Sequence, residues 1–186
     1  MAALPDPTAS LQGTARALFD HMASARAYAD GRAQLGEVYV RMFNNPGVAE
    51  KVGALGEHLR FGGVLPDDVR ELIILRFSAQ ARFGYEWSHH QRPAKLAGLD
   101  QATIDALTAG EIPDTLPDAS QAALAAVDAV NAKQSIPADV QQRFVAVHGN
   151  AGIVELVVLC GLYGIMGDMC VAFDIEVEEG FPKPPF

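Results

Sequence analysis

Basic residues are few in this sequence, and they form no run. Lysine and arginine total 14 against 23 aspartates and glutamates, so the formal net charge is −9 over 186 residues. Proteins that bind nucleic acid or anionic membrane surfaces use clustered basic side chains for the purpose. We therefore expect neither nucleic acid nor a membrane as a partner.

The sequence also lacks targeting and membrane-spanning patterns. Residues 1–13 have neither the charged nor the apolar block of a signal peptide, which makes a cytoplasmic location the default. The longest apolar segment, 151–175, is interrupted by Glu155 and Asp168. The stretch between these acids is too short for a membrane-spanning helix of about 20 residues. A buried core helix is expected there.

Cysteine is almost absent. Cys160 and Cys170 are the only two, and both fall in the predicted helix 150–175. Ten residues along a helix separate their Cα atoms by about 15 Å, whereas a disulfide needs about 7 Å or less. They cannot pair with each other and are expected to be small core residues.

Strand patterns are missing except for one short alternation at 174–178, and helical punctuation fills the rest. Hydrophobic residues at 49% and charged residues at 20% are ordinary for a globular chain. We predict one all-α domain. Expected N-caps are Ser10, Asn45 and Asp100, and expected helices include about 10–28, 45–60, 118–133, 137–147 and 150–175, with another beginning at Pro66.

Gly161, Gly164 and Gly167 recur at every third position. A phosphate-binding loop would need a preceding strand and a following lysine, and the sequence has neither. The spacing instead indicates small residues that let another helix approach closely.

The segment from Glu71 to Gly98 has the highest density of ionisable and aromatic side chains within an apolar region. Burying such groups without hydrogen-bond partners is costly, so we expect them to surround a cavity. Six consecutive positions contain most of them, namely Tyr85, Glu86, Trp87, His89 and His90.

Gly84 is predicted to break this segment into two antiparallel helices. The fold-back brings Glu71 towards Glu86 and His90, which lie four residues apart on one helix face. An acid beside an imidazole orients the ring for proton transfer near neutral pH. In the alternative interpretation, Glu86 and His90 form only a helix-stabilising surface pair.

Metal binding is the second chemical possibility, because Glu86 and His89 form a Glu-x-x-His motif. Di-iron bundles need a second such motif and two more glutamates, and the sequence has no second motif. Adjacent histidines on a helix diverge by about 100°. We therefore expect no metal and no cofactor.

These residues resemble the carboxymuconolactone decarboxylase family, whose superfamily includes the AhpD-type alkylhydroperoxidases. The resemblance covers roughly residues 35–177 of a single domain, 1–186, and implies an AhpD-like helical bundle that forms trimers or hexamers. The N-terminal helix and the proline-rich C-terminal tail are extensions. The matching residues are Leu65-Pro66, Arg70-Glu71-Leu72, Leu75-Arg76, Tyr85-Glu86-Trp87, His90, Ala94, Ala97-Gly98-Leu99, Val154-Glu155-Leu156-Val157 and Gly161-Leu162-Tyr163.

In the peroxidase branch of that superfamily, a glutamate precedes Cys-x-x-Cys and a histidine follows four residues later. Glu71 and His90 match the glutamate and the histidine, but Phe83 and Glu86 occupy the cysteine positions. Thiol chemistry needs a sulfur nucleophile. AhpD-type peroxidase activity is therefore disfavoured.

The decarboxylase branch implies cofactor-independent loss of CO₂ from a small carboxylated lactone, followed by protonation of a dienolate. Such a site needs a donor at the developing oxyanion and a nearby acid, with an arginine for the substrate carboxylate. A non-catalytic helical binding or assembly protein is the remaining hypothesis. The expected catalytic residues are Glu71, Glu86, His90 (the proton donor) and Tyr85, and the expected substrate-binding residues are Trp87, His89, Arg76 and Arg60.

Overall fold

The computed structural model describes residues 3–25 and 35–186. Within these ranges the chain forms only helices, which confirms the all-α prediction, and the alternation at 174–178 is not a strand. The elements are the 3-10 helix η1 (Thr8–Ser10) and the α-helices α1 (Gly13–Ala25), α2 (Glu37–Met42), α3 (Pro46–Phe61), α4 (Asp67–Ala81), α5 (Gly84–Leu96), α6 (Gln101–Ala109), α7 (Asp118–Asn131) and α8 (Ala138–Phe173).

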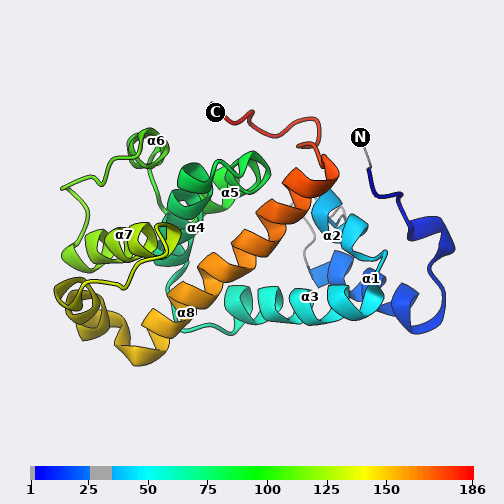
Figure 1. The fold of residues 1–186 in the computed structure, drawn as a ribbon, viewed down its shortest axis with the longest axis horizontal. Helices are drawn as coiled ribbons and strands as arrows, with labels where there is room; N and C mark the ends of the chain where they lie inside the picture. The colour runs from blue at the N-terminus through cyan, green and yellow to red at the C-terminus, as the bar shows by residue number, and fades with distance from the viewer. Residues whose placement is uncertain (1–2, 26–34) are drawn as a thin grey trace.

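Helix α8 crosses the whole molecule and connects two groups of helices (Figure 1). On one side α4 packs against α5, α6, α7 and α8, and on the other α3 contacts α1, α2 and α8. All residues from Val69 to Ser78 of α4 are buried. This part of the helix has no solvent face, so its charged side chains must find partners inside the protein.

The helix boundaries follow local chemistry that the sequence shows. The side chains of Asn45 and Asp100 accept hydrogen bonds from the amides of Val48 and Thr103, which confirms both predicted caps. The first helix begins at Gly13 and not near Ser10, and its predicted end at Tyr28 lies outside the described residues.

Two predicted boundaries differ from the structure. The break between α4 and α5 lies at Arg82, which has a left-handed backbone (φ 57°), and Gly84 is the first residue of α5. The predicted helices 137–147 and 150–175 form one element, α8, with a kink at Gly149 (φ 67°, ψ 176°). A glycine tolerates this conformation because it has no Cβ.

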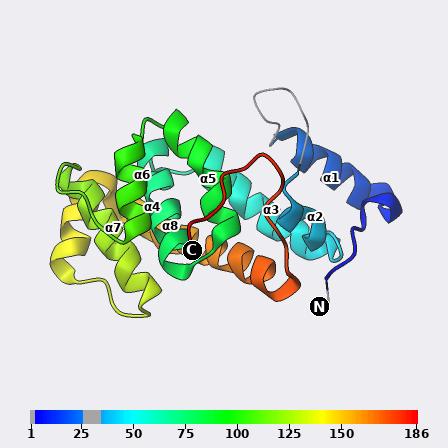
Figure 2. The same ribbon diagram turned by 90° about the horizontal axis from the view of Figure 1, so that it is seen from above.

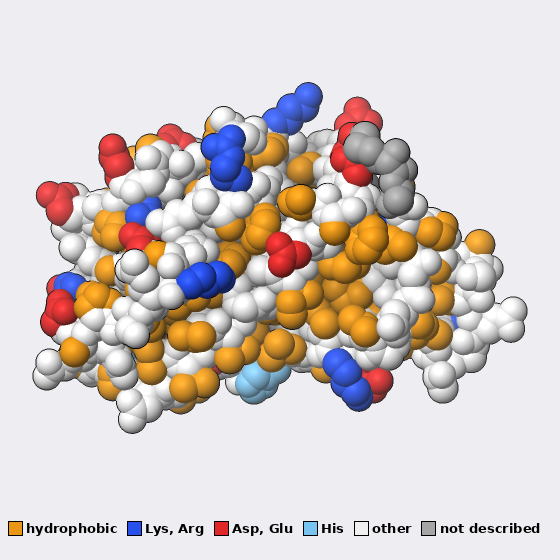
Figure 3. All heavy atoms as spheres, in the orientation of Figure 1, with side chains coloured by type: hydrophobic (Ala, Val, Ile, Leu, Met, Phe, Trp, Pro, Cys, Tyr) orange, Lys and Arg blue, Asp and Glu red, His pale blue; other side chains and the backbone are white. Residues whose placement is uncertain are grey.

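Helix α8 is not the fully buried core helix expected from its sequence. By length and composition it could cross a membrane, but only 39% of its most apolar window is buried in the protein. One face packs on α4, α5 and α7, and the other contributes to a broad apolar surface (Figure 3). The exposed apolar side chains of α8 are Val147, Val154, Val157, Val158, Ile165 and Val171.

The three regularly spaced glycines of α8 have different environments. At Gly167 an added Cβ would collide with the ring of Phe83, so this glycine does allow a close approach. At Gly161 it would meet nothing within 4 Å, because this position faces outward. The trimer or hexamer and the cytoplasmic location stay predictions.

Candidate functional site

A cavity of about 670 Å³ lies between the α4–α5 hairpin, α3, α8 and the C-terminal segment. Its wall on α8 is apolar and consists of Leu159, Leu162 and Met166, next to Tyr163. The structure brings six of the eight predicted site residues to this cavity: Arg60, Glu71, Tyr85, Glu86, His89 and His90.

The imidazole of His90 connects three helices. Its Nδ1 lies 2.7 Å from Glu71 Oε2 on α4, and its Nε2 lies 2.8 Å from the hydroxyl of Tyr163 on α8. A carboxylate can only accept a hydrogen bond, so His90 Nδ1 carries a proton and donates to Glu71. When the ring is neutral, Nε2 has no proton and accepts a hydrogen bond from the hydroxyl of Tyr163. Sequence reasoning gave Tyr163 no role, although it belongs to the run that resembles the family.

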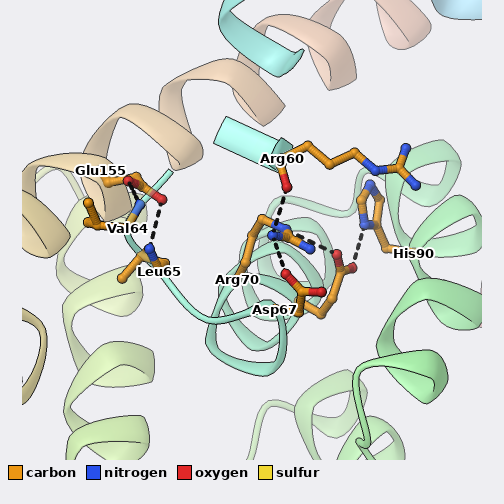
Figure 4. A network of polar contacts seen from close by, with 8 residues as sticks. Arg60, Val64, Leu65, Asp67, Arg70, His90 and Glu155 are labelled. Carbon is orange, nitrogen blue, oxygen red and sulfur yellow. Dashed lines mark hydrogen bonds and ion pairs between the residues drawn. The ribbon is translucent and has the colours of Figure 1, made fainter. Parts of the chain in front are cut away.

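Glu71 is held by a basic neighbour on the same helix. Arg70 Nε lies 3.4 Å from Glu71 Oε1, while Arg70 Nη1 donates to Asp67 Oδ1 at 2.8 Å and to the carbonyl of Arg60 at 3.2 Å. Figure 4 shows the guanidinium of Arg70 between Asp67 and the carbonyl of Arg60, and His90 to the right of this group. The guanidinium of Arg70 is thus engaged by the protein and balances the buried carboxylate of Glu71.

Glu86 lines the cavity as a fully buried acid. Its Oε1 has no hydrogen-bond partner, and burial, together with the negative charge of Glu178, raises its pKa to about 8. The side chain is therefore mainly a neutral carboxylic acid at pH 7, able to donate a hydrogen bond or a proton. Glu71, and not Glu86, orients His90, because the two ring nitrogens of His90 already face Glu71 and Tyr163.

Glu178 is a cavity residue that sequence reasoning missed. It accepts hydrogen bonds from the Tyr85 hydroxyl (2.7 Å) and the Glu37 amide (2.9 Å), and its Oε2 lies 2.6 Å from His89 Nε2. Burial by itself raises the pKa of Glu178, but the contacts with His89, Glu37 and Tyr85 outweigh it and lower the pKa to about 2. Glu178 follows the end of α8, so helical spacing gave no signal for it.

This second cluster changes the roles expected for Tyr85 and His89. The hydroxyl of Tyr85 is engaged by Glu178. The ring of His89 is stacked between Tyr85 and Phe181, with centroid distances of 4.2 and 4.0 Å. Both side chains therefore form part of the cavity wall and hold the C-terminal segment.

Two predicted substrate-binding residues point elsewhere. Arg76 makes two contacts with the carboxylate of Asp128, at 2.7 and 2.8 Å, and donates to the carbonyl of Glu111. The indole Nε1 of Trp87 donates to Thr108 Oγ1 at 2.9 Å within the core near α6. Neither residue lines the cavity.

The cavity nevertheless has basic side chains for an anion. Arg60 and Arg92 line it, and both residues are solvent-exposed. Sequence reasoning named Arg60 and missed Arg92, which is close to His90 in the chain.

The two cysteines lie outside the cavity lining and are buried as free thiols. Burial raises the pKa of Cys160 to about 12 and also raises that of Cys170. Neither is a ready thiolate near His90. Among the described residues, no group of three His, Cys, Asp or Glu side chains is arranged to hold a metal ion.

Comparison with known proteins identifies the class. Residues 46–129, which include both helices of the hairpin, match the model of the carboxymuconolactone decarboxylase family. Through that region the chain is similar to this family. A search of curated proteins found no match.

Solved structures of similar fold include a debrominase and a protein of unknown function. The debrominase Bmp8, in a complex of a variant with 2,3,4-tribromopyrrole, is similar with a TM-score of 0.72 and 18% identity over 91% of this chain and 90% of that one. Its apo form gives a TM-score of 0.71 at 18% identity with the same coverage. A protein of unknown function from Agrobacterium tumefaciens, whose name relates it to the antioxidant defence protein AhpD, gives 0.64 at 22% identity over 73% and 93%. At these identities the likeness establishes the AhpD-like fold.

Proposed function

We propose that this protein is an enzyme of cofactor-independent acid–base chemistry, decarboxylating a small carboxylated or lactone substrate in the cavity or carrying out a related proton transfer. The observation that supports it is the chain of contacts Glu71–His90–Tyr163, which opens into the same cavity as the neutral acid Glu86. A paired acid and imidazole beside a second acid of raised pKa is the arrangement that proton transfer near pH 7 requires.

The substrate carboxylate enters near Arg60 and Arg92, since Arg70 is already engaged. Cleavage of the bond to that carboxylate releases CO₂, and the electron pair of the bond moves onto the remaining carbon and, by conjugation, onto the lactone carbonyl oxygen. The neutral carboxyl of Glu86 hydrogen-bonds this oxyanion. Such a donor in a water-poor site stabilises developing charge more than water would.

The dienolate carbon then takes a proton from the chain that ends at Tyr163. Burial, followed by the charges of Glu71 and Glu86, raises the pKa of Tyr163 well above its ordinary value, so its hydroxyl stays protonated. In the doubly protonated form of His90, Nε2 is the donor in this contact; the hydroxyl gives its own hydrogen to the substrate and takes the one on Nε2. Glu71 stabilises the imidazolium before transfer, and His90 regains its proton from solvent.

A deuterium experiment tests this function. Purified protein is incubated in D₂O with a panel of carboxylated lactones and 3-oxo acids, and NMR follows substrate loss and deuterium at the former carboxyl-bearing carbon. We expect turnover with single deuterium incorporation, and a loss of about 10² or more in His90→Ala with unchanged helicity.

His21→Ala is the matched control, because His21 is an exposed histidine with Nε2 3.7 Å from Glu57 Oε2. It should retain full turnover. Equal turnover in His90→Ala and the wild type would overturn the assignment. Binding of panel compounds without any turnover would identify a non-catalytic binding protein in its place.

A further inference from the structure

The C-terminal segment 174–186 forms one wall of the cavity. Helix α8 ends at Phe173, and Asp174 with a left-handed backbone (φ 54°) turns the chain back. The segment then passes over α5, and its last residue, Phe186, contacts Trp87 of that helix (Figures 1 and 2). Residues 178–182 line the cavity.

Side-chain contacts hold this segment at two separate places. Next to the cavity, Glu178 contacts His89, Tyr85 and the Glu37 amide, and Phe181 stacks on His89. Further along, Pro184 lies against Gly84 and the ring of Phe186 contacts that of Trp87 at 6.1 Å between centroids.

The segment differs physically from the other walls of the cavity. Those walls consist mainly of α3, α4, α5 and α8, whose backbones are hydrogen-bonded within each helix. Glu179, Gly180, Pro182, Lys183 and Pro185 of the segment are exposed. A segment with few buried contacts can detach from the rest of the fold at a low cost in free energy.

Movement of this wall would widen the way into the cavity. Glu71 and Glu86 are each 3% exposed and lie deep in the cavity, whereas Arg60 and Arg92, which also line it, are exposed. Gly180 has φ +95°, a conformation that L side chains rarely adopt, and it lies between Glu178 and Phe181.

We infer that segment 174–186 is a hinged wall that admits the ligand, that Glu178 and His89 are its latch, and that Phe181 limits the size of the ligand. It rests on the proposed function in one respect: both place the ligand in this cavity. It makes Glu178 a positioning residue and Phe181 a specificity-determining residue.

Ligand size is tested by binding and requires no turnover. Benzoate and 2-naphthoate are titrated into the full chain by isothermal titration calorimetry, and the ratio of their dissociation constants is compared between variants. Phe181→Ala should shift this ratio by about tenfold in favour of 2-naphthoate, because truncation removes one ring from the wall. Phe186→Ala is the matched control, since Phe186 belongs to the same segment but does not line the cavity. An unchanged ratio in Phe181→Ala, an equal shift in Phe186→Ala, or no binding of 2-naphthoate to Phe181→Ala would overturn the role of Phe181.

The latch is tested by chemical access to His90. Diethyl pyrocarbonate modification of His90 is followed by tandem mass spectrometry, which separates it from His89. Glu178→Ala should increase the rate about fivefold or more, because the open population increases. Glu176→Ala, which removes an exposed carboxylate of the same segment outside the cavity lining, should leave it unchanged. Equal rates in the two variants would overturn the latch, whether or not the protein proves to be a decarboxylase.

Discussion

Glu71 Oε2 lies 2.7 Å from Nδ1 of His90, although the residues are 19 positions apart in the sequence. The contact exists because the chain reverses at Arg82 and α5 packs along α4. It assigns the Nδ1 proton of His90 and directs Nε2 to Tyr163. A carboxylate that fixes an imidazole in this way controls which nitrogen exchanges protons with a substrate.

Glu71→Gln should reduce kcat by about 10² to 10⁴ with a small change in KM, because the amide can stabilise the wrong tautomer and no longer balances an imidazolium. Steady-state kinetics on the substrate identified in the D₂O experiment measures it. Glu50→Gln, an exposed glutamate on α3, is the control. If kcat of Glu71→Gln stays within about threefold of the wild-type value, which is roughly the scatter of such assays, Glu71 acts only in packing.

Glu86→Gln should change the pH dependence of stability. The pKa of Glu86 is raised from 4.5 to about 8, so between these values the folded state retains a proton that the unfolded state loses. Its contribution to the free energy of unfolding is complete below pH 4.5 and is lost as pH rises towards 8, by about 1 kcal/mol per pH unit. Gln cannot titrate. Urea unfolding of both proteins at several pH values should show the variant gaining stability relative to wild type as pH rises, and parallel curves would contradict the raised pKa.

Arg60→Ala should raise KM about tenfold and leave kcat nearly unchanged, because it removes a cation that binds the substrate carboxylate equally before and during reaction. Steady-state kinetics on the same substrate provides both constants. An unchanged KM would transfer this role to Arg92.

Arg76→Ala should act on stability and not on KM. It removes a guanidinium that is 4% exposed and leaves Asp128 with a partly buried, uncompensated charge. We expect the free energy of unfolding to fall by about 2 to 3 kcal/mol, slightly less than for a fully buried pair, because the Asp128 side chain is 34% exposed. Urea unfolding measures the loss. A rise in KM without destabilisation would contradict the placement of Arg76.

Replacing both Cys160 and Cys170 by serine should leave turnover unchanged. Both thiols are buried, outside the cavity lining, and have raised pKa values. A peroxide-consumption assay with a dithiol reductant should show no activity above background in either protein. Thiol-dependent peroxide consumption that disappears in the double variant would restore the peroxidase hypothesis.

Local chemistry in the sequence determined much of the fold. The caps at Asn45 and Asp100 and the helical spacing of apolar residues depend on neighbours within a few positions, so they could be predicted. The pairing of an acid from α4 with a histidine of α5 also followed from a chain reversal near Gly84, although the reversal itself lies at Arg82.

The rest depended on contacts between distant segments. Arg76 and Arg60 look equivalent in sequence, but Arg76 is paired with Asp128 of α7, whereas Arg60 lines the cavity. Tyr163 and Glu178 contact His90 and His89 only because α8 and the segment after it return across α5. The helices, the family resemblance and the candidate acid–base residues follow from the order of amino acids alone. Which side chains share the cavity, and which carboxyl stays protonated, depends on the folded chain, because burial and long-range hydrogen bonds set both.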